Sequence, residues 1–367
     1  MTPAFDTRLG RDVVVKLPHL GGELPRCDVD LSDNTNLWGA PPAAVRALQA
    51  ASSEALSQYP SLYSEPLRAA LLNYVSMQDA SGISVVTGCG SDDVLDSTMR
   101  AFGEPGDRIA FSSPTFSMIP LLARLNGLDT VPIPLTPSFD LDVQQLVDAQ
   151  ARITYVCAPN NPTGTGVTRG AVEYVVEHAA GIVLIDEAYA EFAPEVFVHL
   201  VAQNERVIVA RTFSKAFGMA GLRVGYGIAS VENARLIERA RGPYKVGRLA
   251  EQAVLATLDP ASDGLAWVRT HAALAIENRE RLSAALRVLG MSVLPSAANF
   301  VMVPDSRASV FASELRTRGV GVRWFGALPA AIPDFARAGG SALRIGVGPW
   351  ESMQRLLDAF AEVLQCA

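Results

Sequence analysis

Lysine is nearly absent from this chain of 367 residues: Lys16, Lys215 and Lys245 are the only three. Arginine supplies the rest of the 31 basic residues. An arginine side chain stays protonated in proteins, whereas a lysine amine loses its proton where its surroundings favour the neutral form. The few lysines are therefore candidates for a site that needs a neutral amine.

Cysteine and histidine are also scarce, with four of each. The cysteines stand singly at positions 27, 89, 157 and 366 and form no Cys-x-x-Cys pair. This pattern excludes a disulfide framework and a cysteine metal site, and it predicts reduced thiols in a cytoplasmic protein. The histidines form no metal-ligand pattern either, so we expect no metal.

The sequence has no excess of positive charge and no long apolar run. Its formal charge is 31 − 38 = −7, which argues against binding to nucleic acid or to an anionic membrane. No apolar stretch approaches the length of a membrane span, and the N-terminus lacks the apolar core of a signal peptide. Hydrophobic residues make up 49% of the chain and charged residues 19%, which is typical of a compact globular protein.

Short apolar runs alternate with helical patterns from Ile83 to Ile228. Such alternation predicts the α/β class, with a mostly parallel central sheet covered by helices. We predict an N-terminal arm (1–30) packed on the small domain, a large domain (31–260) and a smaller α+β domain (261–367). Within the large domain we expect one helix over residues 43–58 and a tight turn over residues 88–91.

The segment 207–225 combines a predicted buried strand with several polar groups just beyond the strand end. Ligands of α/β proteins sit at the carboxyl ends of the strands. One interpretation is a Schiff-base lysine, Lys215, beside a phosphate held by Thr212, Ser214 and Arg223. The other interpretation is a surface lysine in an ordinary strand-to-helix turn.

The glycine-rich turn at residues 88–92 follows a predicted strand and opens a predicted helix. Backbone N–H groups at a helix start can bind a phosphate. The third glycine of a dinucleotide fingerprint is missing, because Asp93 takes its place, and this counts against a nicotinamide site. An ordinary tight turn is the alternative.

Five further side chains follow or interrupt predicted strands. Phe116 can stack on a planar ligand or belong to the core, and Asn161 can donate to a ligand oxygen or form part of a turn. Asp186 ends an apolar strand, where a charge needs a partner such as a protonated ring nitrogen, unless it caps a helix. Tyr189 lies three residues after Asp186 and can reach the same ligand. Arg344 can clamp a carboxylate, unless the other face of its strand is solvated.

Taken together, these groups are the set that a pyridoxal phosphate site requires. The sequence resembles the fold-type I pyridoxal-phosphate aminotransferases of class I/II, and within them most of all the histidinol-phosphate aminotransferases. The resemblance runs from Asn34 to Gly348 and rests on the motifs GCGSDD, PTF, APNNPTG, DEAY, RTFSKAFGMAGLR and LRIGVG. It implies the fold-type I architecture, pyridoxal 5'-phosphate as cofactor, and a homodimer with its sites at the interface.

The resemblance also implies a role for each matched residue. Lys215 would form the Schiff base and then shuttle the proton, and Asp186 would pair with the pyridine N–H. The ring would contact Phe116, Asn161 and Tyr189. The phosphate would be bound by Ser91, Asp92, Thr212, Ser214, Arg223 and, from the other subunit, Tyr59.

The substrate residues implied by the resemblance are Arg344, for the α-carboxylate, together with Arg323, Asn36 and His19. Arg323 matches a phosphate-binding arginine of the family, or is a solvated strand residue. His19 stands where relatives have a tyrosine, and Asn36 lies in a loop that departs from the usual Asn-Glu-Asn-Pro. The implied reaction is amino transfer between histidinol phosphate, or an aromatic L-amino acid, and 2-oxoglutarate.

Three other functions stay open from the sequence. The first is a decarboxylase of the same fold acting on a substrate such as phosphothreonine, which would release carbon dioxide. The second is a non-catalytic aminotransferase-like domain of a transcription regulator, against which the acidic charge and the lack of a DNA-binding extension count. A nicotinamide-dependent dehydrogenase is the third.

Overall fold

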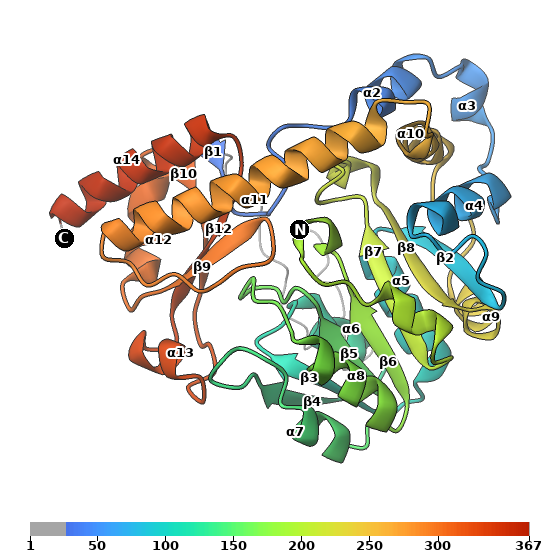
Figure 1. The fold of residues 1–367 in the computed structure, drawn as a ribbon, viewed down its shortest axis with the longest axis horizontal. Helices are drawn as coiled ribbons and strands as arrows, with labels where there is room; N and C mark the ends of the chain where they lie inside the picture. The colour runs from blue at the N-terminus through green and yellow to red at the C-terminus, as the bar shows by residue number, and fades with distance from the viewer. Residues whose placement is uncertain (1–26, 367) are drawn as a thin grey trace, which may run out of the picture.

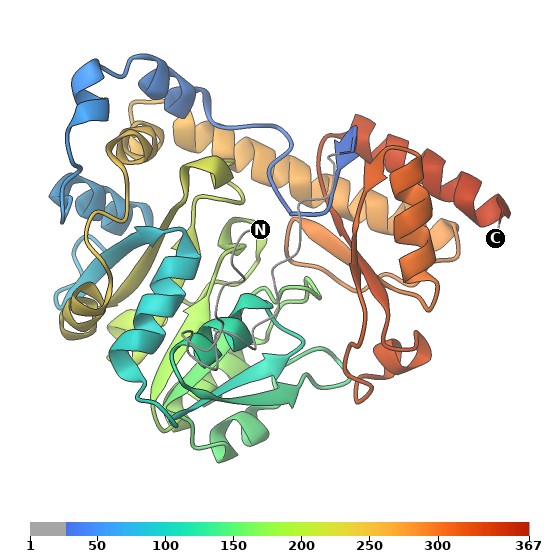
Figure 2. The same cartoon turned by 180° about the vertical axis from the view of Figure 1, so that it is seen from behind.

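The computed structural model describes residues 27–366 and consists of two lobes that lie side by side (Figure 1). The long helix α11 (Gly264–Val288) runs along one edge of both lobes, as the opposite view also shows (Figure 2). The predicted arm at residues 1–30, with His19, lies almost entirely outside the described residues. No helix of the described chain is long and apolar enough to cross a membrane.

The larger lobe is built on a seven-stranded sheet in the order β2-β8-β7-β6-β5-β3-β4 within the described chain. Strands β7, β6, β5, β3 and β4 run parallel, whereas β8 is antiparallel to both of its neighbours. The predicted mostly parallel sheet is therefore confirmed. The strands are β2 (Ile83–Cys89), β3 (Arg108–Ser113), β4 (Asp129–Pro134), β5 (Ile153–Cys157), β6 (Ile182–Asp186), β7 (Val207–Thr212) and β8 (Val224–Ser230).

Helices cover both faces of this sheet, because its central strands are apolar on both sides. In β6, Ile182 and Leu184 pack in the same cluster as α5, α6 and α9, whereas Val183 and Ile185 pack with α4, α7, α8 and α10. The helices of this lobe are α2 (Pro42–Gln49), α3 (Ser53–Ser57), α4 (Glu65–Tyr74), α5 (Ser91–Phe102), α6 (Met118–Leu125), α7 (Val143–Asp148), α8 (Arg169–His178), α9 (Val231–Ala240) and α10 (Arg248–Leu258).

The smaller lobe has an antiparallel sheet in the order β11-β12-β9, with its own apolar core. Its elements are β9 (Phe300–Pro304), α12 (Ala308–Thr317), β10 (Val320–Gly321), β11 (Arg323–Phe325), α13 (Pro333–Arg337), β12 (Ala342–Gly346) and α14 (Trp350–Cys366). The predicted boundary at residue 260 stays a prediction, since α11 contacts α2 and α10 of one lobe and α14 of the other.

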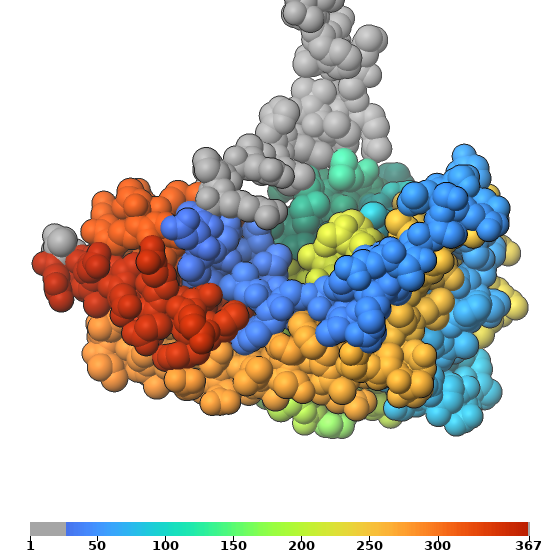
Figure 3. All heavy atoms as spheres, turned by 90° about the horizontal axis from the view of Figure 1, so that it is seen from above, coloured from blue at the N-terminus to red at the C-terminus, as the bar shows by residue number. Residues whose placement is uncertain are grey.

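The start of the described chain joins the two lobes. Strand β1 (Val29–Asp30) pairs with β10 in the smaller lobe, and the chain then crosses to α2 in the larger lobe. In the space-filling view this blue segment lies across the boundary between the lobes (Figure 3). Residues 31–41 are therefore placed where they can face both lobes.

Two local predictions were wrong. The helix expected over residues 43–58 is interrupted between α2 and α3, where the Ser52 hydroxyl accepts a hydrogen bond from the Ala55 N–H at 3.3 Å. Serine side chains favour helix caps over helix interiors, which explains the break. The turn expected over residues 88–91 also starts late, because β2 continues to Cys89 by pairing with β8.

Candidate active site

A cavity of about 990 Å³, counted out to its open mouth, lies between the strand ends of the larger sheet and the smaller sheet. Three neighbouring parallel strands each end on a residue that lines it, namely Cys157 of β5, Asp186 of β6 and Thr212 of β7. The whole lining is Asp33, Asn34, Ser91, Asp92, Thr115, Phe116, Ser117, Cys157, Asn161, Asp186, Ala188, Tyr189, Thr212, Ser214, Lys215, Arg223, Arg323, Phe325 and Arg344.

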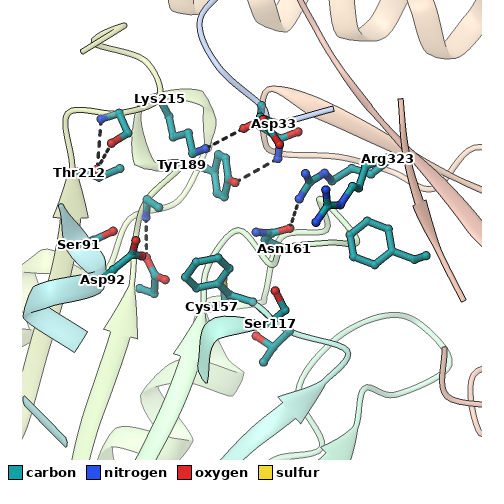
Figure 4. A pocket seen from close by; sticks show the side chains of 18 of the residues that line it. Asp33, Ser91, Asp92, Ser117, Cys157, Asn161, Tyr189, Thr212, Lys215 and Arg323 are labelled. Carbon is teal, nitrogen blue, oxygen red and sulfur yellow. Dashed lines mark hydrogen bonds between the residues drawn. The ribbon is translucent and has the colours of Figure 1, made fainter. Parts of the chain in front are cut away.

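Lys215 extends into this cavity from the turn after β7 (Figure 4). The side chain is partly buried, and its Nζ donates a hydrogen bond to the backbone oxygen of Asp33 at 3.1 Å. Burial, together with the positive charge of Arg344, lowers the pKa of the Lys215 amine to about 8, against the opposing charge of Asp92. A substantial fraction of this amine is therefore neutral near physiological pH.

Two buried aromatic rings hold the turn that carries Lys215. Phe213 and Phe217 flank the lysine, are fully buried, and have their ring centroids 4.5 Å apart. Gly218 has a φ of +64°, and a Cβ there would come 1.8 Å from the backbone oxygen of Gly39. The glycine thus lets the turn pack directly against the loop that precedes α2.

Asp186 is buried at the floor of the cavity, with 3% of its surface exposed. Its Oδ2 accepts a hydrogen bond from the Tyr155 hydroxyl at 2.8 Å, and its Oδ1 accepts one from the Ala188 N–H at 3.1 Å. Burial raises the pKa of Asp186 to about 6, although both hydrogen bonds act in the opposite direction. A cation in the cavity would therefore stabilise the ionised carboxylate.

One end of the cavity gathers groups that bind anions. Arg223 Nη1 donates to the Ser214 hydroxyl at 3.3 Å, and the Thr212 hydroxyl donates to the same oxygen at 3.0 Å. Helix α5 begins beside them at Ser91, where the first backbone N–H groups have no partner within the helix. A hydroxyl pair, a guanidinium and a helix N-terminus together suit a phosphate group.

Two glycines allow these anion-binding groups to converge. Gly90 has a φ of +79°, and a Cβ there would come 2.5 Å from Nη2 of Arg223. A Cβ at Gly225 would come 2.2 Å from the backbone nitrogen of Ser91. The glycine-rich segment noted in the sequence thus holds the start of α5 against Arg223, rather than forming a free turn.

The smaller lobe contributes two arginines to the opposite side. Arg323 of β11 and Arg344 of β12 are register partners in antiparallel strands, which brings both to the cavity. Arg344 donates to Asn161 Oδ1 at 2.8 Å and to the Ser32 backbone oxygen at 2.6 Å. Its Nε is buried and has no partner among the described residues. A donor left in this state points to a ligand that supplies the acceptor.

Of the fourteen predicted site residues that the structure describes, twelve line the cavity and two do not. Asn36 donates instead to the Ala216 backbone oxygen at 2.9 Å, so it supports the turn that carries Lys215. Tyr59 is 78% exposed and stacks on Tyr244 outside the cavity. His19 lies outside the described residues. Sequence reasoning missed Asp33, Asn34, Thr115, Ser117, Cys157, Ala188 and Phe325.

Some of the missed residues had a signal in the sequence. Phe325 is two residues beyond Arg323 in a strand, so both side chains share one face. Cys157 ends the apolar run 153–157 that forms β5, so the reasoning from strand ends applies to it as well. Asn34 begins the loop in which the resemblance placed Asn36. Asp33 had no such signal, because its position depends on how residues 31–41 cross between the lobes.

Pyridoxal-phosphate enzymes need a lysine that becomes neutral at working pH and a carboxylate where the pyridine nitrogen binds. This cavity supplies both, and its anion-binding end suits the phosphate of the same cofactor. The sequence profile of the class I and II aminotransferases matches residues 27–360. The chain belongs to this family and is a pyridoxal-phosphate-dependent aminotransferase, as the sequence predicted.

Individual relatives agree with the family. A histidinol-phosphate aminotransferase of Roseiflexus castenholzii is 37% identical over 349 residues, which are 91% of this chain and 89% of that protein. One from Methanococcoides burtonii is 32% identical over 96% of this chain and 95% of that protein. A solved histidinol-phosphate aminotransferase of Sinorhizobium meliloti in complex with pyridoxal-5'-phosphate has a TM-score of 0.85 and 23% identity, and the match covers 97% of each chain.

Proposed function

We propose that the protein transfers an amino group between histidinol phosphate and 2-oxoglutarate. The observation that carries this proposal is the pairing of Arg323 with Arg344 on the wall that faces Lys215. Two guanidinium groups suit substrates that carry two negative charges or two carboxylates. The names of the relatives support the same donor.

The residues present fit the cofactor. Lys215 would hold its aldehyde carbon, and Asp186 would pair with its ring N–H. Phe116 would stack on the ring, and Asn161 and Tyr189 would contact the ring oxygen. The phosphate would be bound by the backbone N–H groups of Ser91 and Asp92 and by the side chains of Thr212, Ser214 and Arg223. When bound, the cofactor ring takes up the electrons left behind at the substrate α-carbon.

The side chains of the chain itself would perform the proton transfers. The Lys215 Nζ is neutral in part because burial lowers its pKa to about 8. It would take the proton from the substrate α-carbon and deliver it to the cofactor carbon that it had held. Asp186 would stay ionised next to the ring cation, which offsets the cost of its burial. Arg344 would hold the substrate carboxylate through the nitrogen that now lacks a partner.

We also propose a homodimer in which Tyr59 reaches the phosphate of the partner's cofactor. Leu56 and Tyr59 are 72% and 78% exposed, and Leu62, Tyr63 and Tyr244 are exposed as well. A concentration of apolar side chains on one surface favours a protein interface. Sedimentation of the wild type and of Tyr59→Ser should show a dimer that the substitution weakens. A wild-type monomer at assay concentration would contradict this assignment.

The cytoplasmic location of the protein stays a prediction from the cysteine pattern.

An aromatic L-amino acid is a second candidate donor. Phe325 lines the cavity beside Arg323, and its ring can pack against an aromatic side chain. The family and its relatives are aminotransferases, so they give no support to the decarboxylase alternative.

The test is a spectrophotometric screen of amine donors with the acceptor withheld. Histidinol phosphate, phenylalanine, tyrosine and histidine would each be added to the yellow holoenzyme, and loss of colour reports amino transfer. We expect histidinol phosphate to bleach the enzyme at the lowest concentration. If phenylalanine bleaches it while histidinol phosphate does not, the aromatic donor is correct. Carbon dioxide release in the same samples would indicate decarboxylation instead.

A further inference from the structure

Asp33 is a carboxylate on the substrate side of the cavity with no role in the chemistry described above. It lies between Lys215 and Arg323 in the close view of the site (Figure 4). Its side chain is exposed to the cavity, whereas its backbone oxygen accepts the hydrogen bond from Lys215. No ion pair within the described chain includes it.

The charge of Asp33 is felt by the groups that handle substrate. It acts to raise the pKa of both Lys215 and Arg344, which places the carboxylate near the amine and near the guanidinium. Lys215, Arg323 and Arg344 are cations that line the same cavity, and its other carboxylates are Asp92, which pairs with Arg223, and the buried Asp186. A bound substrate therefore meets one acceptor charge among several donors.

The next residue offers a second acceptor. Asn34 is 2% exposed and lines the cavity, and its Nδ2 donates to the Tyr189 hydroxyl at 3.2 Å. Its Oδ1 is buried without a partner in the described chain. Buried polar atoms are usually hydrogen-bonded, so this oxygen indicates a donor that comes from a ligand. Both acceptors stand on the loop that crosses between the lobes.

We infer that Asp33 selects amino donors whose side chain carries an N–H group or a positive charge, and that it disfavours dicarboxylate substrates. A charged acceptor next to the substrate strengthens a hydrogen bond from an imidazole and repels a second carboxylate. This inference rests on the proposed function, since an imidazole and a phosphate together match the acceptor loop and the arginine pair. Selection would come from attraction of one substrate and repulsion of the other.

The experiment compares wild type, Asp33→Asn and Asp33→Glu as holoenzymes. For Asp33→Asn, kcat/KM for histidinol phosphate should fall roughly threefold to tenfold. The KM for 2-oxoglutarate should fall about threefold, because a repulsive charge is gone. With phenylalanine, which has no side-chain N–H, kcat/KM should change less than about twofold. Asp33→Glu keeps the charge, so its kinetic constants for all three substrates should stay closer to those of the wild type.

In Asp33→Asn the donor should be used less well and 2-oxoglutarate should bind better. This combination distinguishes a loss of substrate selection from general damage to the enzyme. A change in Lys215 or in folding would affect every substrate in the same direction, so the ratios between substrates report Asp33 alone. Asp28→Asn is the matched control, because it makes the same change at an exposed carboxylate outside the cavity. Equal factors for the donor and for 2-oxoglutarate, or no change in either, would overturn the inference.

A failure of the proposed function gives a different result. If wild type does not use histidinol phosphate, the comparison is made between histidine and phenylalanine, which share the α-amino acid group and an aromatic ring on a methylene, whereas only histidine has a side-chain N–H. A loss confined to histidine in Asp33→Asn would then support the inference without the proposed substrate. Transfer from phenylalanine but from neither imidazole donor would overturn both.

Discussion

On the large-domain side of the cavity, Asp186 accepts two hydrogen bonds, and the hydroxyls of Thr212 and Ser214 are joined to Arg223. On the opposite side, Arg344 and Asn34 each keep a buried polar atom that has no partner among the described residues. The first side has its internal hydrogen bonds in place, whereas the second lacks some of its partners. We interpret the first side as the proposed cofactor side, which is preorganised, and the second as the proposed substrate side, which bound substrate would complete.

The largest expected effect is on the cofactor side. Lys215→Ala removes the amine that would hold the cofactor and move the proton. We expect kcat to fall by about 10²- to 10⁴-fold or more. Borohydride reduction of the wild-type holoenzyme, followed by peptide mapping, should label Lys215. Lys245→Ala is the matched control, because its Nζ pairs with Asp93 Oδ1 at 2.7 Å and does not line the cavity. Label on Lys245 would contradict the assignment.

Beneath the cofactor side lies a buried ion pair whose loss should affect stability. Arg211 lies in β7, and its Nη2 is 2.7 Å from Oε2 of Glu187, with both side chains buried. Arg211→Met leaves Glu187 without its partner, near Glu191, whose pKa burial already raises. We expect the free energy of unfolding to fall by about 3–5 kcal/mol in chemical denaturation.

The control for this prediction is the exposed pair between Arg46 and Asp263, whose side chains are 60% and 50% accessible. Solvent screens such a pair, so Arg46→Met should leave the unfolding midpoint nearly unchanged. If both variants lose the same free energy of unfolding, the buried ion pair between Arg211 and Glu187 stabilises the fold no more than an exposed pair does.

On the substrate side, Arg344→Lys should weaken substrate binding without loss of cofactor. Lysine cannot reproduce the planar set of donors, so kcat/KM should fall roughly 10- to 100-fold, mainly through KM. The absorbance of the bound cofactor and the melting temperature should stay near wild type. Arg307→Lys is the control, because Arg307 pairs with Asp305 on the surface of the same lobe. A large loss of cofactor in Arg344→Lys would mean that the two sides of the cavity are not separable.

The cofactor side could be predicted from the sequence because its residues end strands within short motifs. Asp186, Thr212 and Lys215 each follow an apolar run, and parallel strands bring their carboxyl ends to one edge. The parallel sheet itself followed from the alternation of strands and helices. Only local details failed, such as the helix break at Ser52, where a hydroxyl competes with the helix.

The substrate side could be predicted only in part. Arg323 and Arg344 were recognised singly, but their pairing depends on the register of two antiparallel strands about 20 residues apart in sequence. Asp33 and Asn34 reach the cavity through a chain crossing in which Asn34 has a φ of +54°. No local pattern of residues specifies that crossing, since it depends on the packing of both lobes.

The smallest effect concerns the hydrogen bond that supports Asp186. Burial holds the pKa of Asp186 at about 6 in the folded chain, above the 3.8 of an unperturbed aspartate. Between these two pH values the folded apoenzyme binds more protons than the unfolded chain, so its stability falls as pH rises from about 4 to about 6. Tyr155→Phe removes the donor to Oδ2 and keeps the ring, which should raise the pKa further and extend this fall above pH 6.

The measurement is the free energy of unfolding of the apoenzyme from pH 4 to pH 8. We expect the difference in free energy of unfolding between wild type and Tyr155→Phe to increase with pH. It should reach about 1–2 kcal/mol once Asp186 is ionised in both proteins. Tyr174→Phe, on the partly exposed helix α8, should give a constant difference instead. Added cofactor should narrow the gap if its ring cation pairs with Asp186. A gap that does not depend on pH would show that Tyr155 stabilises the fold without acting through this carboxylate.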